Sequence, residues 1–120
     1  MKVLVCGGRN YDNWFKVKET LDKIRGDFKT LFIIHGDAAG ADSLAGRWAT
    51  EKGVQEVKCP ANWRYHFKSA GPIRNRAMLD LNPDLVIAFP GGAGTAHMVD
   101  ISKKRGVEVW EIKDDEFCNS

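Results

Sequence analysis

Cysteine is scarce in this sequence, and no apolar stretch is long enough to cross a bilayer. The 3 cysteines, Cys6, Cys59 and Cys118, are odd in number, widely spaced and without a CxxC pair. This pattern excludes a disulfide framework and a zinc site of the usual spacing. The N-terminal apolar run is too short for an export signal. We therefore expect reduced thiols, no membrane anchoring and a cytoplasmic location.

An excess of either charge is also lacking. The 18 Lys and Arg residues stand against 16 Asp and Glu residues, and the net charge of +2 does not by itself indicate a nucleic-acid or membrane surface. His, Cys and carboxylate residues do not cluster at ligand spacing, so neither a metal site nor a cofactor is predicted. A chain of 120 residues, of which 43% are hydrophobic, predicts one globular domain over residues 1–113 and a short tail over residues 114–120.

Short apolar runs alternate with helix-compatible segments along the chain. The runs that predict strands cover residues 2–6, 31–34, 85–89 and 107–112, and residues 55–59 are expected to form a further strand with a weaker apolar pattern. The segments that predict helices cover residues 14–25, 43–52, 72–81 and 95–105. Strands and helices that alternate in this way indicate an α/β fold with a single Rossmann-like, doubly wound parallel sheet of about five strands and helices on both faces.

Local signals predict where individual helices begin and end. Gly26 and Gly53 are expected to end the first two helices. The third helix is expected to begin at Pro72 and to turn Ile73 and Ala77 toward the core.

The turn after the strand at residues 85–89 is the most informative stretch. It contains Pro90, Gly91, Gly92, Gly94 and Thr95, and Thr95 is placed to cap the following helix. A strand, a glycine turn and a helix start bring several backbone N–H groups and the positive end of a helix to one point, which suits a phosphate. Neither the dinucleotide fingerprint nor the lysine-bearing P-loop is matched, so a plain strand-to-helix turn is the alternative.

Other glycine-bearing loops also follow strands. Gly7, Gly8 and Arg9 follow the first strand, and Gly36 and Asp42 follow the second. In doubly wound sheets, ligands bind at the carboxyl ends of the strands, where the strand order reverses. We therefore expect these loops to line one edge of the sheet together with the turn at residues 90–95.

Several polar side chains carry open alternatives. Arg74 and Arg76, beside a glycine turn at a helix start, either clamp a phosphate or form a solvated helix face. Asp42 either caps its helix or contacts a ribose hydroxyl. His35 and His97 are each either an acid or base or a hydrogen-bonded structural group.

The segment between residues 60 and 71 lacks clear periodicity, and we interpret it as a functional loop or lid. Its aromatic residues Trp63, Tyr65 and Phe67 alternate with Arg64, His66 and Lys68. This spacing suits stacking of a base or of single-stranded nucleic acid, whereas the alternative is a loop packed down by its aromatic rings. Trp63 is favoured as an anchor on the sheet edge.

Four motifs follow one another along the chain. They are Gly7-Gly8-Arg9-x-Tyr11, His35-Gly36-x-Ala38-x-Gly40-Ala41-Asp42, Ala70-Gly71-Pro72-x-Arg74-Asn75-Arg76-x-Met78 and Pro90-Gly91-Gly92-x-Gly94-Thr95. With these motifs the chain resembles, over nearly its whole length, the YspA or YpsA-related branch of the SLOG superfamily, named after the SMF DNA-processing proteins and the LOG phosphoribohydrolases. The resemblance implies a Rossmann-like, SLOG-type nucleotide-binding domain that holds a phosphate at the last motif, with an arginine of the third motif nearby.

LOG-type hydrolases carry a catalytic glutamate three residues after the threonine of the last motif. Met98 occupies that position here. A methionine can neither act as a base nor stabilise a developing ribosyl cation, so the catalytic residues stay unknown. An enzyme would have to recruit another acid, such as Asp42, Asp100 or His97.

The leading hypothesis is therefore a sensor or sequestering protein that binds a nucleotide-derived ligand related to NAD or ADP-ribose. One alternative is a nucleotide hydrolase or LOG-like phosphoribohydrolase with a non-standard acid. Another is SMF-like binding of single-stranded nucleic acid, against which the near-neutral charge argues. The resemblance also implies a homo-oligomer.

Overall fold

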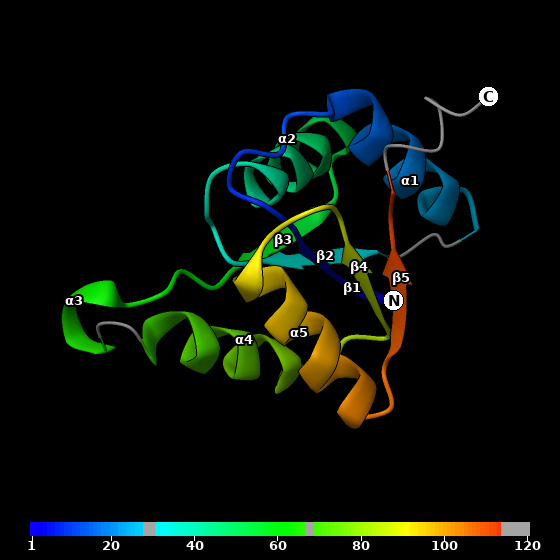
Figure 1. The fold of residues 1–120 in the computed structure, drawn as a ribbon. Helices are drawn as coiled ribbons and strands as arrows, with labels where there is room; N and C mark the ends of the chain where they lie inside the picture. Colours follow the sequence, from blue (N-terminus) through cyan, green and yellow to red (C-terminus); the bar gives the residue numbers. More distant parts are fainter. Residues whose placement is uncertain (28–30, 67–68, 114–120) are drawn as a thin grey trace.

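A computed structural model describes residues 1–27, 31–66 and 69–113, which form helices on both faces of one sheet (Figure 1). The strands are β1 (Lys2–Cys6), β2 (Phe32–His35), β3 (Gln55–Lys58), β4 (Leu85–Ala88) and β5 (Glu108–Glu111). The helices are α1 (Trp14–Asp27), α2 (Ala41–Lys52), α3 (Trp63–His66), α4 (Ala70–Leu79) and α5 (Ala93–Lys104). All neighbouring strands are parallel, in the order β3-β2-β1-β4-β5, so the predicted doubly wound sheet is confirmed.

The apolar core lies on both sides of the central strand β1. In Figure 1, α1 and α2 lie above the sheet, and α4 and α5 lie below it. The upper cluster includes Val3, Val5, Leu21 and Trp48. The lower cluster includes Leu4, Cys6, Met78 and Met98. Because β1 is covered on both faces, its sequence is a continuous apolar run without polar alternation.

The strand order reverses between β1 and β4, and this places two glycine loops side by side. The two strands pair in register from Val3 with Leu85 to Cys6 with Ala88. Beyond them, the Gly8 N–H donates a hydrogen bond of 2.9 Å to the carbonyl oxygen of Pro90. This reversal is the position at which open α/β sheets bind ligands.

Two capping predictions are wrong because α2 and α5 begin earlier than the sequence patterns indicate. The helices start directly after Gly40 and Gly92, so Asp42 and Thr95 lie inside the first turn and cap neither helix. Gly40 has a φ of 77°, which L side chains rarely adopt, and a Cβ there would collide with the carbonyl oxygen of Gly8. Contact between two loops, and not a capping side chain, therefore determines where α2 begins.

The predicted orientation of α4 is also wrong. The helix begins at Ala70, and Ile73 is 39% exposed, with Ala77 exposed as well. Its buried face instead carries Asn75, Met78 and Leu79. These three residues keep the i, i+3, i+4 spacing of a buried helical stripe. Because the first of them, Asn75, is polar, the apolar pattern in the sequence predicted the wrong buried face.

Three smaller differences complete the comparison with the predicted elements. α1 continues through Gly26 to Asp27, because glycine is tolerated inside a helix, whereas Gly53 closes α2 as predicted with a left-handed φ of 67°. The expected aromatic loop contains the short helix α3. Phe67, Lys68 and the predicted tail at residues 114–120 lie outside the described residues. In the described part of the chain, no helix combines the length and apolar character needed to traverse a bilayer.

Candidate functional site

A cavity of about 620 Å³ opens at the carboxyl ends of β1 and β4, where the strand order reverses. The predicted site residues that line it are Gly7, Gly8, Arg9, Asp42, Arg74, Gly92, Gly94 and Thr95. They come from the loop after β1, from the starts of α2 and α5, and from α4. The structure therefore brings together residues that are up to about 90 positions apart in the sequence.

The remaining predicted site residues lie elsewhere. Pro90 and Gly91 line an adjoining hollow of about 820 Å³ between α5 and the end of β5, which shares Gly92 and Thr95 with the first cavity. Arg76 is exposed and is not among the residues that line the 620 Å³ cavity. Trp63 belongs to α3, and its side chain lies outside what the structure describes.

Gly36 lies behind the cavity wall, where its backbone N–H and C=O groups are held from two sides. The Asp42 carboxylate oxygen Oδ2 accepts hydrogen bonds from the Gly36 N–H at 3.0 Å and the Ala38 N–H at 3.3 Å. On the other side, Arg74 Nη1 donates to the Gly36 carbonyl oxygen at 2.8 Å. A Cβ at position 36 would collide with the Arg74 guanidinium group, so only glycine permits this approach.

Asp42 is a buried carboxyl group that folds the loop after β2. It is 6% exposed, and burial raises its pKa, although the N–H groups of Ala38 and Gly36 and the nearby Arg74 favour the charged form. Its position in the cavity wall leaves the predicted ribose contact open, whereas the predicted helix cap is excluded.

A polar chain links Arg74 to His97 across α4 and α5. Arg74 Nε donates to Asn75 Oδ1 at 3.2 Å, and Asn75 Nδ2 donates to the Gly94 carbonyl oxygen at 3.3 Å and to His97 Nδ1 at 3.1 Å. Because Nδ1 accepts this bond, the neutral His97 ring carries its proton on Nε2. Asn75 and His97 both line the cavity. Asn75 was not predicted as a site residue, although it stands in the third motif and is the polar residue on the buried stripe of α4.

The three acids that an enzyme could recruit are placed differently. Asp42 and His97 line the cavity. Asp100 is exposed, forms an ion pair of 3.0 Å with Lys104 and lines only the hollow beside β5. Met98, at the position of the LOG glutamate, is 0% exposed and packs in the lower core.

Cys6 contributes a thiol to the cavity wall, but its surroundings disfavour the nucleophilic thiolate form. The residue is 8% exposed. Burial raises the pKa of Cys6 to about 12, and the carboxylate of Asp42 acts in the same direction. Among the residues described, no three His, Cys, Asp or Glu side chains are grouped so that they could hold a metal ion.

Known proteins resemble the chain in sequence and in fold. Residues 1–66 match the family described as the YspA, cpYpsA-related SLOG family. The Gene 61 protein of Mycobacterium phage D29 is 34% identical over 121 residues, which cover 94% of this chain and 97% of the phage protein. The X-ray structure of DNA processing protein A (DprA) from Streptococcus pneumoniae has a TM-score of 0.78 and 18% identity over 98% of this chain. The chain spans 54% of the DprA chain, and this likeness shows the fold.

The burial of Cys6 predicts that its thiol reacts slowly in the folded protein. Iodoacetamide should modify the half-buried Cys59 at least about tenfold faster than Cys6, because Cys59 is the more accessible of the two thiols. Peptide mass mapping over time measures both rates, and urea should make the two cysteines equally reactive. Rapid modification of Cys6 in the folded state would contradict the suppressed thiolate.

Proposed function

Because the chain belongs to the YspA, cpYpsA-related SLOG family, we propose that it binds a nucleotide-derived ligand in the cavity at the carboxyl ends of β1 and β4. The phosphate lies at the first turn of α5, beside Gly92, Gly94 and Thr95. Backbone N–H groups in a first helical turn have no intrahelical acceptor, and the helix dipole favours an anion there.

The observation that carries the proposal is glycine at positions where packing does not require it. A Cβ at Gly92 or Gly94 would meet no protein atom within 4 Å. Gly94 also lies inside α5, where glycine is less favourable than alanine. A ligand that approaches the backbone closely supplies the reason for glycine that the protein's own contacts do not.

Arg74 and Asp42 give the cavity groups for the rest of a nucleotide. Arg74 uses Nη1 and Nε for Gly36 and Asn75, and an arginine has five N–H donors in total, so donors remain for a phosphate. Asp42 accepts the backbone hydrogen bonds from Gly36 and Ala38 through Oδ2, which leaves Oδ1 for a ribose hydroxyl. The volume of about 620 Å³ suits a nucleotide-sized molecule related to NAD or ADP-ribose. The role we propose is that of a sensor or sequestering protein in the cytoplasm.

A hydrolase is the second candidate, because a carboxyl group and an imidazole line the same cavity. Asn75 holds His97 with Nδ1 as an acceptor, so the neutral ring keeps a proton on Nε2 for donation to a leaving group. Asp42 is the carboxyl group that lines the same cavity. In this alternative the pair takes the place of the glutamate that Met98 replaces.

The ligand proposal predicts that intact ligand is recovered from the protein. The protein is incubated with AMP, NAD, ADP-ribose and cyclic ADP-ribose, separated from free ligand and heat-denatured, and the released molecules are identified by mass spectrometry. Gly94→Ala should lower retention at least about tenfold, or about 1.4 kcal/mol, because its Cβ meets the phosphate. The same change should leave the free energy of unfolding unchanged or raise it by up to about 1 kcal/mol.

Gly26→Ala is the matched control for this experiment. Gly26 also lies in a helix, and a Cβ there also meets nothing within 4 Å, but α1 is not part of the cavity. The Gly26→Ala variant should bind ligand as the unchanged protein does. A freed base or ribose phosphate would instead favour the hydrolase, and retention of none of the four molecules would contradict the binding proposal.

Nucleic-acid binding is the third candidate, since the solved structure with the same fold is named as a DNA-processing protein. Tyr65 on α3 is 74% exposed and Arg64 beside it is exposed. Balanced charge argues against the idea. We expect no binding of a labelled single-stranded oligonucleotide at low salt by fluorescence anisotropy. Binding that falls steeply with salt and is weakened in Tyr65→Ala would favour nucleic acid instead.

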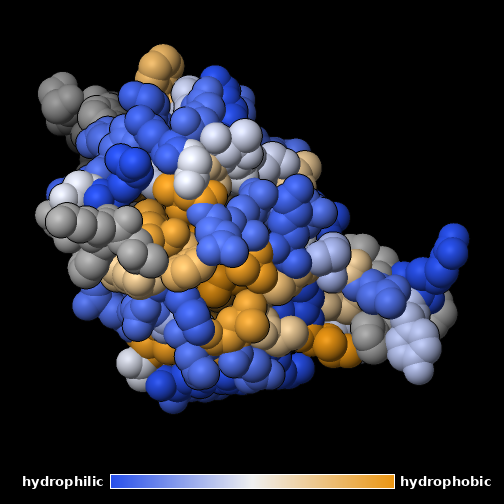
Figure 2. All heavy atoms as spheres, turned by 180° about the vertical axis from the view of Figure 1, so that it is seen from behind, coloured by the Kyte–Doolittle hydropathy of each residue, from blue (hydrophilic) through white to orange (hydrophobic). Residues whose placement is uncertain are grey.

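Self-association remains a prediction of the family resemblance. Figure 2 shows apolar surface gathered on the face seen from behind. The exposed apolar side chains of the described residues include Val57 on β3, Ile73 on α4 and Leu81 just after α4, at 37%, 39% and 37% exposure. We expect Ile73→Lys to lower the fraction of dimer in sedimentation equilibrium, since a charge would enter a buried apolar contact. If the unchanged protein sediments as a monomer, the prediction of a homo-oligomer is contradicted.

A further inference from the structure

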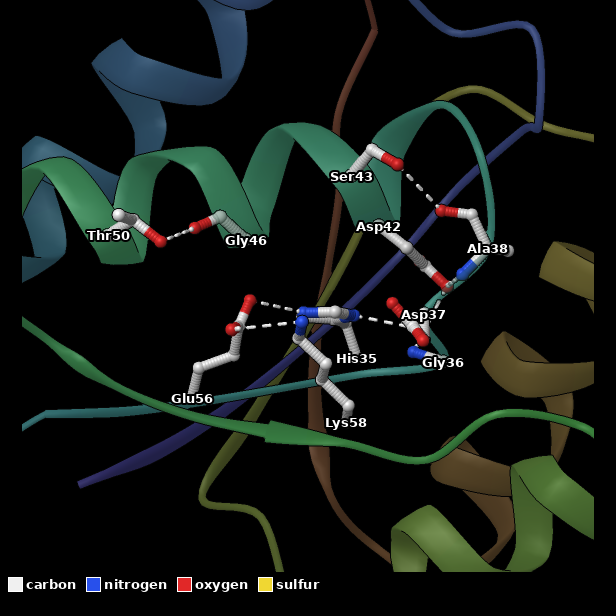
Figure 3. Close-up of polar contacts among 10 residues, drawn as sticks. All are labelled: His35, Gly36, Asp37, Ala38, Asp42, Ser43, Gly46, Thr50, Glu56 and Lys58. Atoms are coloured by element: carbon white, nitrogen blue, oxygen red, sulfur yellow. Dashed lines mark hydrogen bonds and ion pairs between the residues drawn. The ribbon is translucent and has the colours of Figure 1, made fainter.

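His35 is a buried titratable side chain that the proposed ligand contacts do not use. It ends β2, is 1% exposed and is not among the residues lining the cavity. Figure 3 shows its ring between Glu56 on β3 and the backbone of Asp37. Nε2 lies 2.6 Å from Glu56 Oε2, and the Asp37 N–H donates to Nδ1 at 2.9 Å.

These two contacts fix the protonation of the ring. The Asp37 N–H can only donate, so Nδ1 must be unprotonated. The proton therefore sits on Nε2 and is donated to the Glu56 carboxylate. A doubly protonated ring would place an N–H group against the Asp37 N–H, and this hydrogen bond would be lost.

The Asp37 N–H is part of a loop conformation that needs support. Asp37 has a φ of 55°, which is uncommon for a residue other than glycine. The Gly36 carbonyl group, which shares a peptide bond with the Asp37 N–H, accepts from Arg74, and the Gly36 N–H donates to Asp42. His35 thus holds the same short turn that positions both of these side chains in the cavity wall.

The helix above the pair is shaped to admit it. A Cβ on Gly46, in the middle of α2, would collide with Glu56 Oε2 and would lie 3.2 Å from His35 Nε2. Glycine is unfavourable inside a helix, so its presence here is explained by the space that the imidazole and carboxylate occupy. α2, β2 and β3 therefore meet at this one hydrogen bond.

The charged groups around the ring come from each element that packs against it. Glu56 is on β3, and Lys58 Nζ lies 3.9 Å from its other carboxylate oxygen. Asp42 on α2 is close enough for its pKa to be lowered by a charge on His35, against the larger raising effect of its burial. Asp37 presents its backbone to the ring, and its side chain is exposed.

We propose that His35 is a positioning residue for the ligand cavity and that protonation of its ring switches the cavity to a low-affinity state. Neutral His35 holds the turn at Gly36 and Asp37, and the turn holds Arg74 and Asp42. The sign follows from the geometry: binding needs the ring without a proton on Nδ1, so affinity falls as the pH falls. The affinity part of this inference rests on the proposed ligand site, whereas the positioning part does not.

Amide hydrogen exchange by NMR tests the positioning part without any ligand. When the pH is lowered from about 8 to about 5, the Asp37 amide should lose at least about tenfold of its protection factor, because a doubly protonated ring can no longer accept its hydrogen bond. His35→Asn keeps an acceptor near the Nδ1 position, so in this variant the Asp37 amide should stay protected over the whole pH range. In His35→Gln the side chain can reach Glu56 but offers the Asp37 N–H no acceptor. The Asp37 amide of this variant should therefore be unprotected at both ends of the pH range.

Nitrogen-15 spectra of the imidazole in the unchanged protein add a measurement that no folding defect can disturb. They should show an unprotonated Nδ1 and a protonated Nε2 at the alkaline end. The opposite tautomer, or an Asp37 amide equally protected at both ends of the pH range, would overturn the inference.

AMP binding by calorimetry tests the affinity part. Across this pH range the affinity for AMP should fall at least about tenfold more in the unchanged protein than in His35→Asn. The AMP phosphate titrates equally in both experiments, so comparing the two proteins removes its effect. An equal fall in both proteins would overturn the switch. If AMP does not bind at alkaline pH, the ligand proposal fails for AMP, while hydrogen exchange still decides whether His35 positions the loop.

Discussion

The backbone of Gly36 is held between a carboxylate and a guanidinium group, and the cavity depends on this arrangement. Its N–H donates to Asp42 and its carbonyl oxygen accepts from Arg74. A buried peptide without partners would destabilise the fold, so satisfying it joins β2, α2 and α4 at one point. The same contacts fix two side chains at the cavity wall. Among the described residues, no buried side-chain nitrogen or oxygen atom lacks a hydrogen-bond partner.

Although the edge strands β3 and β5 are partly exposed, the centre of the sheet was predictable from the sequence because β1, β2 and β4 are buried on both faces. Such strands leave apolar runs that end in glycine, and each run can be recognised locally. The N-terminal cap of α2 was not predictable, because Asp42 carries the same local signal whether it caps its own helix or folds the preceding loop. The choice is made by Gly40, which packs against the loop after β1, about 30 residues earlier in the chain.

The cavity was predictable as a set of loops but not as a set of side chains. Arg74 and Arg76 lie in one turn of α4 and look equivalent in the sequence. Residues two apart on a helix point in different directions, and packing of Met78 and Leu79 in the core turns Arg74 to the cavity and Arg76 to the surface. Asn75 was missed for the related reason that its partners, Gly94 and His97, belong to a different helix. Contacts between distant segments leave no periodic signal.

The central position of β1 has a consequence for how the protein is made. This strand is synthesised first, yet one of its neighbours, β4, ends about 80 residues later. At a synthesis rate of about 5–20 residues per second, one edge of this apolar strand has no strand partner for several seconds. Pairings of such long sequence separation also fold slowly. The nascent chain is therefore most exposed to aggregation before residue 85 leaves the ribosome, and a chaperone that covers the first strand would act in that interval.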